Sequence, residues 1–380
     1  MNLLLYELKK LFSLPTIWAF VLCCFALNAL FLSEQWYDRT YFNEISGIVS
    51  MLGQRIDDAF LHRLELLPES ETRSALLKST SDLEDEFDSF DVGRLSTYYQ
   101  EMVKESSVVS GWMEWKYRKV SERVESLGAS NTGMDVYAGP MTYQIHQFLF
   151  GLLLRAITAE SCIISALAAL YIYAYEQMNR TQPHLAVSRT GRRLWQVKAV
   201  SSILASIMIF CILSVVSLGA YFLFWNYSGI WNANVSSLFN QLAAQLVVRP
   251  FITWADFSVT GYLTASLVVG AALAAICAAG ASFLGILSRN SYIAALALGL
   301  WSAGGSALTS FLGERKWWIA YEVSCFQPII LWLDEGAWFT ETGLNTVLPF
   351  QECLGIFLNL ALGTLGILFA VRRFGRKDLM

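Results

Sequence analysis

The sequence EQMNRTQPHLAVSRTGRRLWQVK, residues 176–198, separates two long apolar runs, Ile157–Tyr175 and Ala199–Trp225. Each run has about the 20 helical residues that cross the hydrocarbon core of a bilayer. The stretch between them carries five basic residues and one acidic residue. Because short basic loops of membrane proteins stay on the cytoplasmic side, the stretch predicts two spans joined by a cytoplasmic loop.

The composition of the whole chain is that of a membrane protein. Of its 380 residues, 55% are hydrophobic and 15% are charged, against about 25% charged in soluble domains. The chain is therefore expected to be an all-α polytopic membrane protein with six transmembrane helices. The expected spans are Thr16–Leu32, Ile157–Tyr175, Ala199–Trp225, Tyr262–Leu287, Ile293–Leu312 and Cys353–Val371.

The distribution of basic residues predicts the orientation. Twelve lie in the N-terminal segment, the two short inner loops and the C-terminal tail, against three in the expected outer segments 226–256 and 313–352. This asymmetry predicts a multi-pass protein of a cell membrane, which we expect to be bacterial, with both termini cytoplasmic. A cleaved signal peptide is the alternative for the first span, but that run is longer than a usual signal core and no A-x-A site follows it.

Between the first two spans lies a segment of different composition. Residues 1–33 are expected to form an interfacial helix and the first span, and residues 146–380 the other five spans. Residues 34–145 hold 20 acidic and 11 basic residues, a net charge of −9, and no cysteine. Their apolar residues recur at helical spacing, so we expect a mostly helical extracytoplasmic domain, large enough for its own core.

The densest charge run of this domain is a candidate outer acidic patch. A calcium loop would need glycine at its sixth position, where Phe87 stands, so a solvated helix face is the favoured interpretation. The patch consists of Asp82, Glu84, Asp85, Glu86 and Asp88.

Two charged residues near the start of the second span form a candidate intramembrane polar site. Arg155 can extend its head group to the outer interface. Glu160 lies inside the apolar run, where a carboxylate is costly and faces a partner, a cavity or a substrate path. Structural pairing and a functional role both stay open for Glu160.

The outer segments carry three further expectations. Leu238–Val248 is expected to be an apolar helix on the membrane surface. Four tryptophans are expected to form an aromatic belt at headgroup level, and a bridge between Cys325 and Cys353 stays open. The four are Trp317, Trp318, Trp332 and Trp338.

Catalytic motifs are absent from the sequence. It contains no G-x-x-x-x-G-K-[ST] phosphate loop, no H-E-x-x-H and no G-x-S-x-G. Its three histidines are scattered, so no metal site is expected. We therefore expect a protein that is not itself an enzyme and that binds no cofactor and no nucleic acid.

Four stretches together resemble the membrane (permease) subunits of type-2 ATP-binding-cassette (ABC) exporters, which have six spans and an N-terminal interfacial helix. A glutamate stands at the inner end of their second span, a coupling helix follows it, and a basic C-terminus closes the chain. One departure is that Met178-Asn179-Arg180 replaces the usual glycine after the glutamate. The matching stretches are Tyr6–Phe12, Tyr175–Glu176, Ser188–Lys198 and Arg372–Leu379.

The resemblance implies partners. It implies cytoplasmic P-loop ATPase subunits that hold ATP and magnesium, and a second permease subunit, identical or different, within the membrane lipids. The loop 176–198 is then the element that couples this chain to the ATPase, with Glu176 either contacting a partner, which we favour, or capping the following helix. The coupling residues are Glu176, Arg180, Ser188, Arg189, Gly191, Arg192 and Arg193.

The sequence is compatible with two candidate functions. In the first, the chain is the permease of an exporter, and the acidic outer domain attracts cationic substrates. Cationic antimicrobial peptides are the leading substrate class, with lipids and hydrophobic drugs left open. In the second, the chain is a membrane sensor or scaffold whose outer domain binds a ligand without transport.

Overall fold

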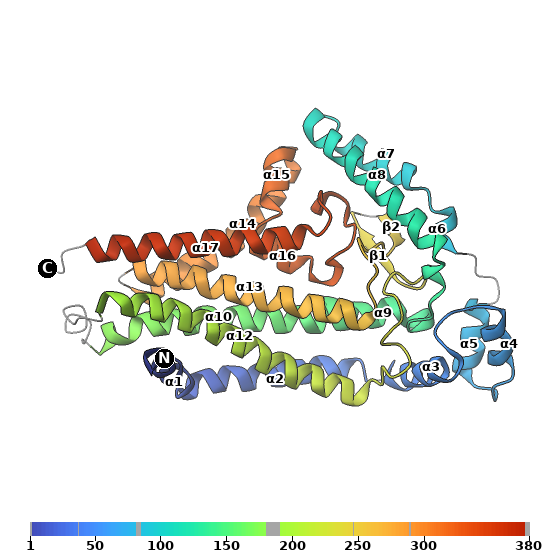
Figure 1. Cartoon of the computed structure of the whole chain (residues 1–380), viewed down its shortest axis with the longest axis horizontal. Helices are drawn as coiled ribbons and strands as arrows, with labels where there is room; N and C mark the ends of the chain where they lie inside the picture. The colour runs from blue at the N-terminus through green and yellow to red at the C-terminus, as the bar shows by residue number, and fades with distance from the viewer. Residues whose placement is uncertain are drawn as a thin grey trace.

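The computed structural model describes residues 2–36, 38–80, 85–179, 191–245, 247–288 and 290–376. These residues form a mostly helical molecule with one small two-stranded sheet. Figure 1 shows an elongated bundle of long helices with a group of short helices at one end. The predicted all-α fold class is therefore confirmed in its main feature.

Within the described residues, six helices are long and apolar enough to cross a membrane, as the sequence predicts. Pro15 is the first residue of the first span, where its missing N–H is not needed. The six are α2 (Pro15–Glu34), α10 (Arg155–Met178), α12 (Gly191–Phe224), α13 (Val259–Leu287), α14 (Ser291–Glu314) and α17 (Gln351–Arg376).

The second span is longer than predicted. The short helix α9 (Thr142–His146) and the π-helical segment η3 (Gln147–Leu154) continue directly into α10. A Cβ atom on Gly336 would stand 2.9 Å from the Cα atom of Gly151 in η3. The entry of the second span is thus packed backbone against backbone, and only glycine fits there.

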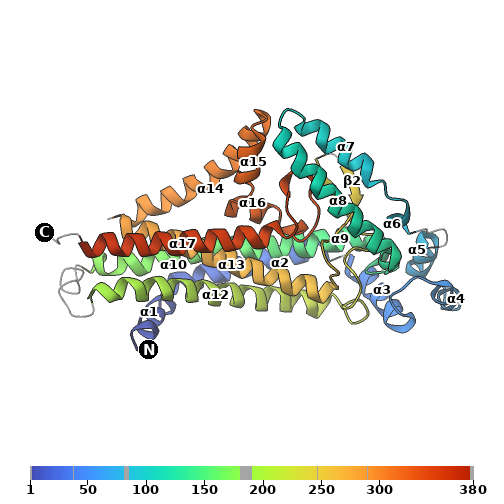
Figure 2. The ribbon, with the colours of Figure 1, turned by 45° about the horizontal axis from the view of Figure 1, so that its top comes forward.

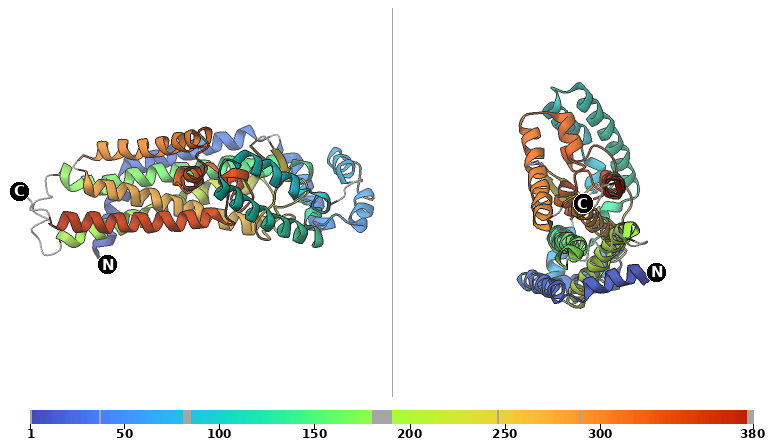
Figure 3. Two further views of the ribbon diagram at one scale, coloured as in Figure 1. Left: turned by 90° about the horizontal axis from the view of Figure 1, so that it is seen from above. Right: turned by 90° about the vertical axis from the view of Figure 1, so that its left-hand side faces the viewer.

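Three of the six helices form the centre of the bundle. About half of the apolar window of α10, α12 and α13 is buried, 56, 50 and 56%, against 22, 17 and 17% for α2, α14 and α17. Figure 3 shows the long helices side by side, and Figure 2 shows α14 diverging from α17 toward α15 (Trp318–Ser324). Small residues let α13 pack closely on α12, since a Cβ on Gly270 would lie 2.9 Å from Phe210.

The two ends of the bundle differ. The C-terminal ends of α10, α13 and α17 and the N-terminal ends of α12 and α14 lie at the end that holds both chain termini (Figure 1). We call this the terminal end. The opposite end carries the cap, which we define as residues 38–146, 226–258 and 315–350. Helix α1 (Asn2–Phe12) lies against α12 and α10 at the terminal end.

The cap begins with six helices, as the helical periodicity of residues 34–145 predicts. Two apolar stripes with this periodicity, Leu95–Met102 and Trp112–Leu127, lie on the last two of these helices. Of these positions, Leu95, Tyr99 and Val120 are buried. The six are α3 (Asp38–Leu52), α4 (Asp58–Glu65), α5 (Glu71–Thr80), α6 (Glu86–Ser89), α7 (Val92–Val103) and α8 (Ser107–Ala129).

Residues 34–145 do not pack around a core of their own. The apolar side chains of α3 to α5 belong to the same core as the long helices, for example Phe42 together with Tyr221. Those of α6 to α8 pack on later parts of the chain, including Ile252 and Leu344. The cap is therefore assembled from three separate segments, which a local pattern cannot reveal.

The prediction of a helix over Leu238–Val248 is wrong. An antiparallel hairpin stands there, formed by β1 (Gln241–Ala244) and β2 (Val247–Pro250), with Leu242 opposite Arg249. Gln245 takes a left-handed conformation (φ 44°) at the turn, and its side chain accepts a hydrogen bond from Tyr99 Oη at 2.9 Å. Contacts with α7 thus override the weak helical pattern.

The aromatic belt is only partly supported. Trp317 is 61% exposed, but Trp318 and Trp338 are buried, so the prediction is wrong for these two. Trp338 Nε1 donates to the carbonyl of Leu331 in α16 (Pro328–Leu333) at 2.8 Å. Cys325 and Cys353 are both free thiols, so the bridge is not formed.

A buried ion cluster holds the segments of the cap together. Glu341 Oε1 lies 2.7 Å from Lys116 Nζ of α8, and Glu341 Oε2 lies 2.7 Å from Arg249 Nε of β2. Tyr117 Oη and the backbone N–H of Gly343 also donate to Glu341. Burial alone would raise the pKa of Glu341, but the charges of Lys116 and Arg249 lower it to about 2.

We predict that Glu341→Ala destabilises the cap by about 3–5 kcal/mol, because Lys116 and Arg249 are left as buried cations that have lost their counter-charge. Thermal unfolding of the purified protein, followed by near-ultraviolet circular dichroism, measures this. The control is Glu101→Ala, which breaks the exposed pair with Lys104 and should cost at most about 1 kcal/mol. Equal losses in the two variants would contradict the role of the cluster.

Candidate functional site

The terminal end of the bundle contains a buried cluster of four charges. Lys10 Nζ of α1 lies 2.9 Å from Glu7 Oε1 and 2.9 Å from Glu176 Oε1 at the end of α10. Glu176 Oε2 pairs with Lys198 of α12, whose Nζ also donates to the carbonyl of Ile172 at 2.7 Å. We call these four charged residues the terminal cluster; it joins α1, α10 and α12 through one carboxylate.

The terminal cluster is shielded from water. The side chains of Lys10 and Glu176 are each 8% exposed and that of Lys198 is 2% exposed. Lys10 Nζ lies 4.4 Å from the ring centre of Tyr175, a cation–π contact. Burial alone would lower the pKa of Lys10, but its bonds to Glu7 and Glu176 raise that pKa above its usual value. Two acids and two bases of the described residues therefore lie together in a nearly dry site.

The terminal cluster stands at the base of the predicted coupling loop. Helix α10 ends at Met178 and α12 begins at Gly191, so Glu176 and Lys198 hold the two sides of that loop together. Arg192 and Arg193 follow in the first turn of α12. Three other predicted coupling residues, Arg180, Ser188 and Arg189, lie outside the described residues.

The sequence analysis favoured a contact between Glu176 and another protein. Among the described residues its basic partners, Lys10 and Lys198, come from its own chain, and its side chain is 8% exposed. The analysis missed Glu7 and Lys10 as its neighbours. The sequence shows that Glu7 and Lys10 lie on the polar face of an amphipathic N-terminal helix. It does not show which part of the molecule that helix contacts.

We predict that Glu176→Ala lowers thermal stability by about 3–5 kcal/mol, because it leaves Lys198 buried without its carboxylate. The double variant Glu176→Ala with Lys198→Met should recover part of that loss, because position 198 then no longer carries a buried charge without its partner. Unfolding of the detergent-solubilised protein measures both. A double variant no more stable than the single one would contradict this account.

The candidate intramembrane pair is separated in the structure. Asn28 Nδ2 of α2 donates to Glu160 Oε2 at 2.9 Å and to Ser217 Oγ of α12 at 3.0 Å. Arg155 instead donates to the carbonyl of Leu333 in α16 at 3.3 Å. Glu160 thus has a structural partner that connects three spans, and Arg155 contacts the cap.

The candidate acidic patch is not one solvated helix face. Asp82 and Glu84 lie outside the described residues. Asp85 is buried and caps α6 by accepting a hydrogen bond from the Phe87 N–H at 3.0 Å, and burial raises its pKa. Glu86 is half-buried and Asp88 is exposed. The solvated-face interpretation is therefore wrong for Asp85.

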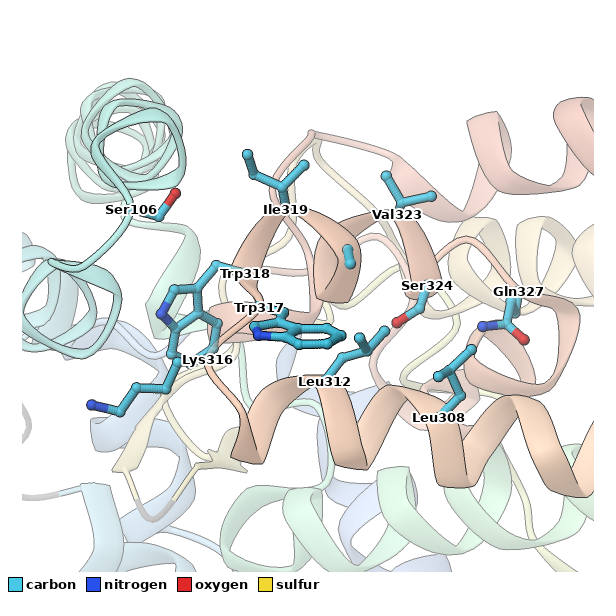
Figure 4. Close-up of a pocket in the computed structure, with 11 residues that line it drawn as sticks. Ser106, Leu308, Leu312, Lys316, Trp317, Trp318, Ile319, Val323, Ser324 and Gln327 are labelled. Carbon is cyan, nitrogen blue, oxygen red and sulfur yellow. The ribbon is translucent and has the colours of Figure 1, made fainter.

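Helix α15 lies between two hollows that the sequence did not indicate. On one side is an apolar groove of about 810 Å³ between α14 and α15. Figure 4 shows Trp317 between these two helices, above Leu312. On the other side a smaller pocket of about 190 Å³ lies between α15 and α8, and Val323 lines both.

Comparison of this chain with family models, curated proteins and solved structures finds no match. The arguments for function therefore rest on the residues and their geometry, together with the resemblance of the four short stretches.

Proposed function

We propose that this chain is the membrane subunit of an ABC exporter, driven by ATP hydrolysis in a separate cytoplasmic subunit. The observation that carries the proposal is the terminal cluster at the base of the loop 176–198. A carboxylate buried between two lysines fixes the end of one span to the start of the next and to α1. A loop anchored in this way can pass a movement to three helices together.

The proposed orientation places the terminal end in the cytoplasm and the cap outside a bacterial cell membrane. The basic residues of the loop 176–198 and of the C-terminal tail support this placement through the positive-inside rule. The cap then receives or gates the substrate, and its net charge of −9 over residues 34–145 favours cationic peptides.

In the proposed mechanism, the ATPase subunits hold ATP and magnesium and bind the loop, where Arg192 and Arg193 offer planar charged groups for carboxylates. Their movement shifts α1, α10 and α12 as one body because the terminal cluster resists separation. Helices α2, α14 and α17 are only about one-fifth buried, which leaves apolar faces for lipid and for a second permease subunit.

The sensor function stays the second candidate, and the pocket between α8 and α15 is the observation that favours it. A sensor would bind its ligand there without an ATPase. Co-purification distinguishes the two functions, because a P-loop ATPase recovered with the chain supports the exporter and its consistent absence supports the sensor.

We predict that Arg192→Ala with Arg193→Ala leaves the protein inserted and folded but reduces the amount of co-purified ATPase about tenfold or more. Loss of a buried interface charge pair costs about 2–5 kcal/mol. The matched control is Arg94→Ala with Arg118→Ala, which removes two exposed arginines of the cap. Full recovery of the ATPase with the loop variant would contradict its coupling role.

Orientation is tested with single cysteines in a cysteine-free background, at Ser79, Ser188 and Gly375. Because the cap is proposed to lie outside, an impermeant thiol reagent should label position 79 on intact cells. Positions 188 and 375 should react only after permeabilisation. Labelling of position 188 on intact cells would overturn the proposed arrangement.

A further inference from the structure

The pocket between α8 and α15 has aromatic walls and one acidic residue. A space of about 190 Å³ is lined by Trp112 and Trp115 of α8, by Phe326 and Val347, and by Glu322 of α15. A cavity of roughly 150 Å³ is enough to hold a benzene ring. Trp112 is 40% exposed, so the pocket reaches the protein surface at that ring.

Glu322 has no hydrogen-bond partner in the described part of the chain. The residue is 3% exposed, and neither carboxylate oxygen is bonded there. The charge of Lys116 acts on Glu322, but its ammonium group pairs with Glu341 at 2.7 Å and donates to Gly343. Tyr321 and Cys325 are the other titratable groups beside Glu322. A buried carboxyl group without a partner requires an explanation in a native fold.

The walls determine which cation suits this pocket. Their accessible surface is almost wholly apolar, and the Glu322 carboxylate lies buried in the wall, so a metal ion or a primary ammonium would lose its water without replacement. A quaternary ammonium group donates no hydrogen bond and is weakly hydrated. Its charge is attracted by the faces of tryptophan rings, the best cation–π partners.

We propose that this pocket binds a small organic cation carrying a quaternary ammonium group, with Trp112 and Trp115 as its aromatic contacts and Glu322 as its counter-charge. The site is distinct from Asp85, Glu86 and Asp88 of the candidate acidic patch and from the terminal cluster. It does not rest on the proposed transport function, because an exporter and a sensor could both use it.

The proposal has a consequence for pH. Burial raises the pKa of Glu322 to about 8, and the positive charge of Lys116 lowers it in part. The empty pocket therefore holds a neutral carboxyl group at pH 7, and a bound cation must displace its proton. Affinity should rise about tenfold per pH unit below pH 8 and level off above it.

The test uses choline as probe and the full chain purified in detergent, with binding measured by isothermal titration calorimetry. The neutral analogue 3,3-dimethylbutan-1-ol has the same shape without the charge. We expect choline to bind at pH 8.5 at least about tenfold more tightly than this alcohol. Equal binding of the two, or no binding of choline at all, would overturn the proposal.

Variants assign the binding to the pocket. Glu322→Gln should weaken choline binding about tenfold and abolish its pH dependence. Trp112→Leu, at the exposed rim, should weaken binding without the folding risk of a buried change. Glu314→Gln removes an exposed acid at the end of α14 and should leave binding unchanged. Wild-type affinity in both pocket variants, or an equal loss in Glu314→Gln, would place the binding elsewhere.

Discussion

The burial of one carboxylate between two lysines is the constraint on which the terminal end of this molecule depends. Glu176 stays charged away from water because Lys10 and Lys198 lie beside it. That requirement fixes α1 against the bundle and sets the spacing of α10 and α12. The central helices are otherwise joined mainly by small residues and apolar contacts, which tolerate sliding more readily than a buried ion pair does.

Two buried carboxylates of the cap, Glu341 and Glu322, have different surroundings. Around Glu341, two cations compensate one carboxylate, and distant segments are joined. Around Glu322, neither carboxylate oxygen has a hydrogen-bond partner among the described residues, and Lys116, which pairs with Glu341, compensates its charge only in part. The first arrangement explains how three separate segments form one body. The second leaves a charge requirement that a ligand can satisfy.

The parts of the fold that follow from local pattern could be predicted from the sequence. Long apolar runs identified six spans, and the basic loop beside Glu176 marked the terminal end. Helical periodicity identified α7 and α8. The parts that depend on distant contacts could not be predicted. Lys116 bonds to Gly343 across 227 positions, and the hairpin at Gln241–Pro250 is held by residues of α7. No local signal records which segment will pack on which.

The same distinction applies to the candidate sites. Glu176 was found because a lone acid at the end of an apolar run is conspicuous, whereas Glu7 and Lys10 looked like an ordinary polar helix face. Glu322 lies among aromatic and aliphatic residues with no motif around it. Its importance appears only when α8 is seen beside α15.

The central claim is that the loop between α10 and α12 receives an ATPase. Photo-crosslinking from Val187 in intact cells tests it most directly, with Ala320 in α15 at the opposite end as the control position. The account predicts a crosslinked P-loop ATPase from position 187 and none from position 320. A protein that carries the crosslinker at 187 and captures no ATPase, or captures one equally at both positions, would contradict it.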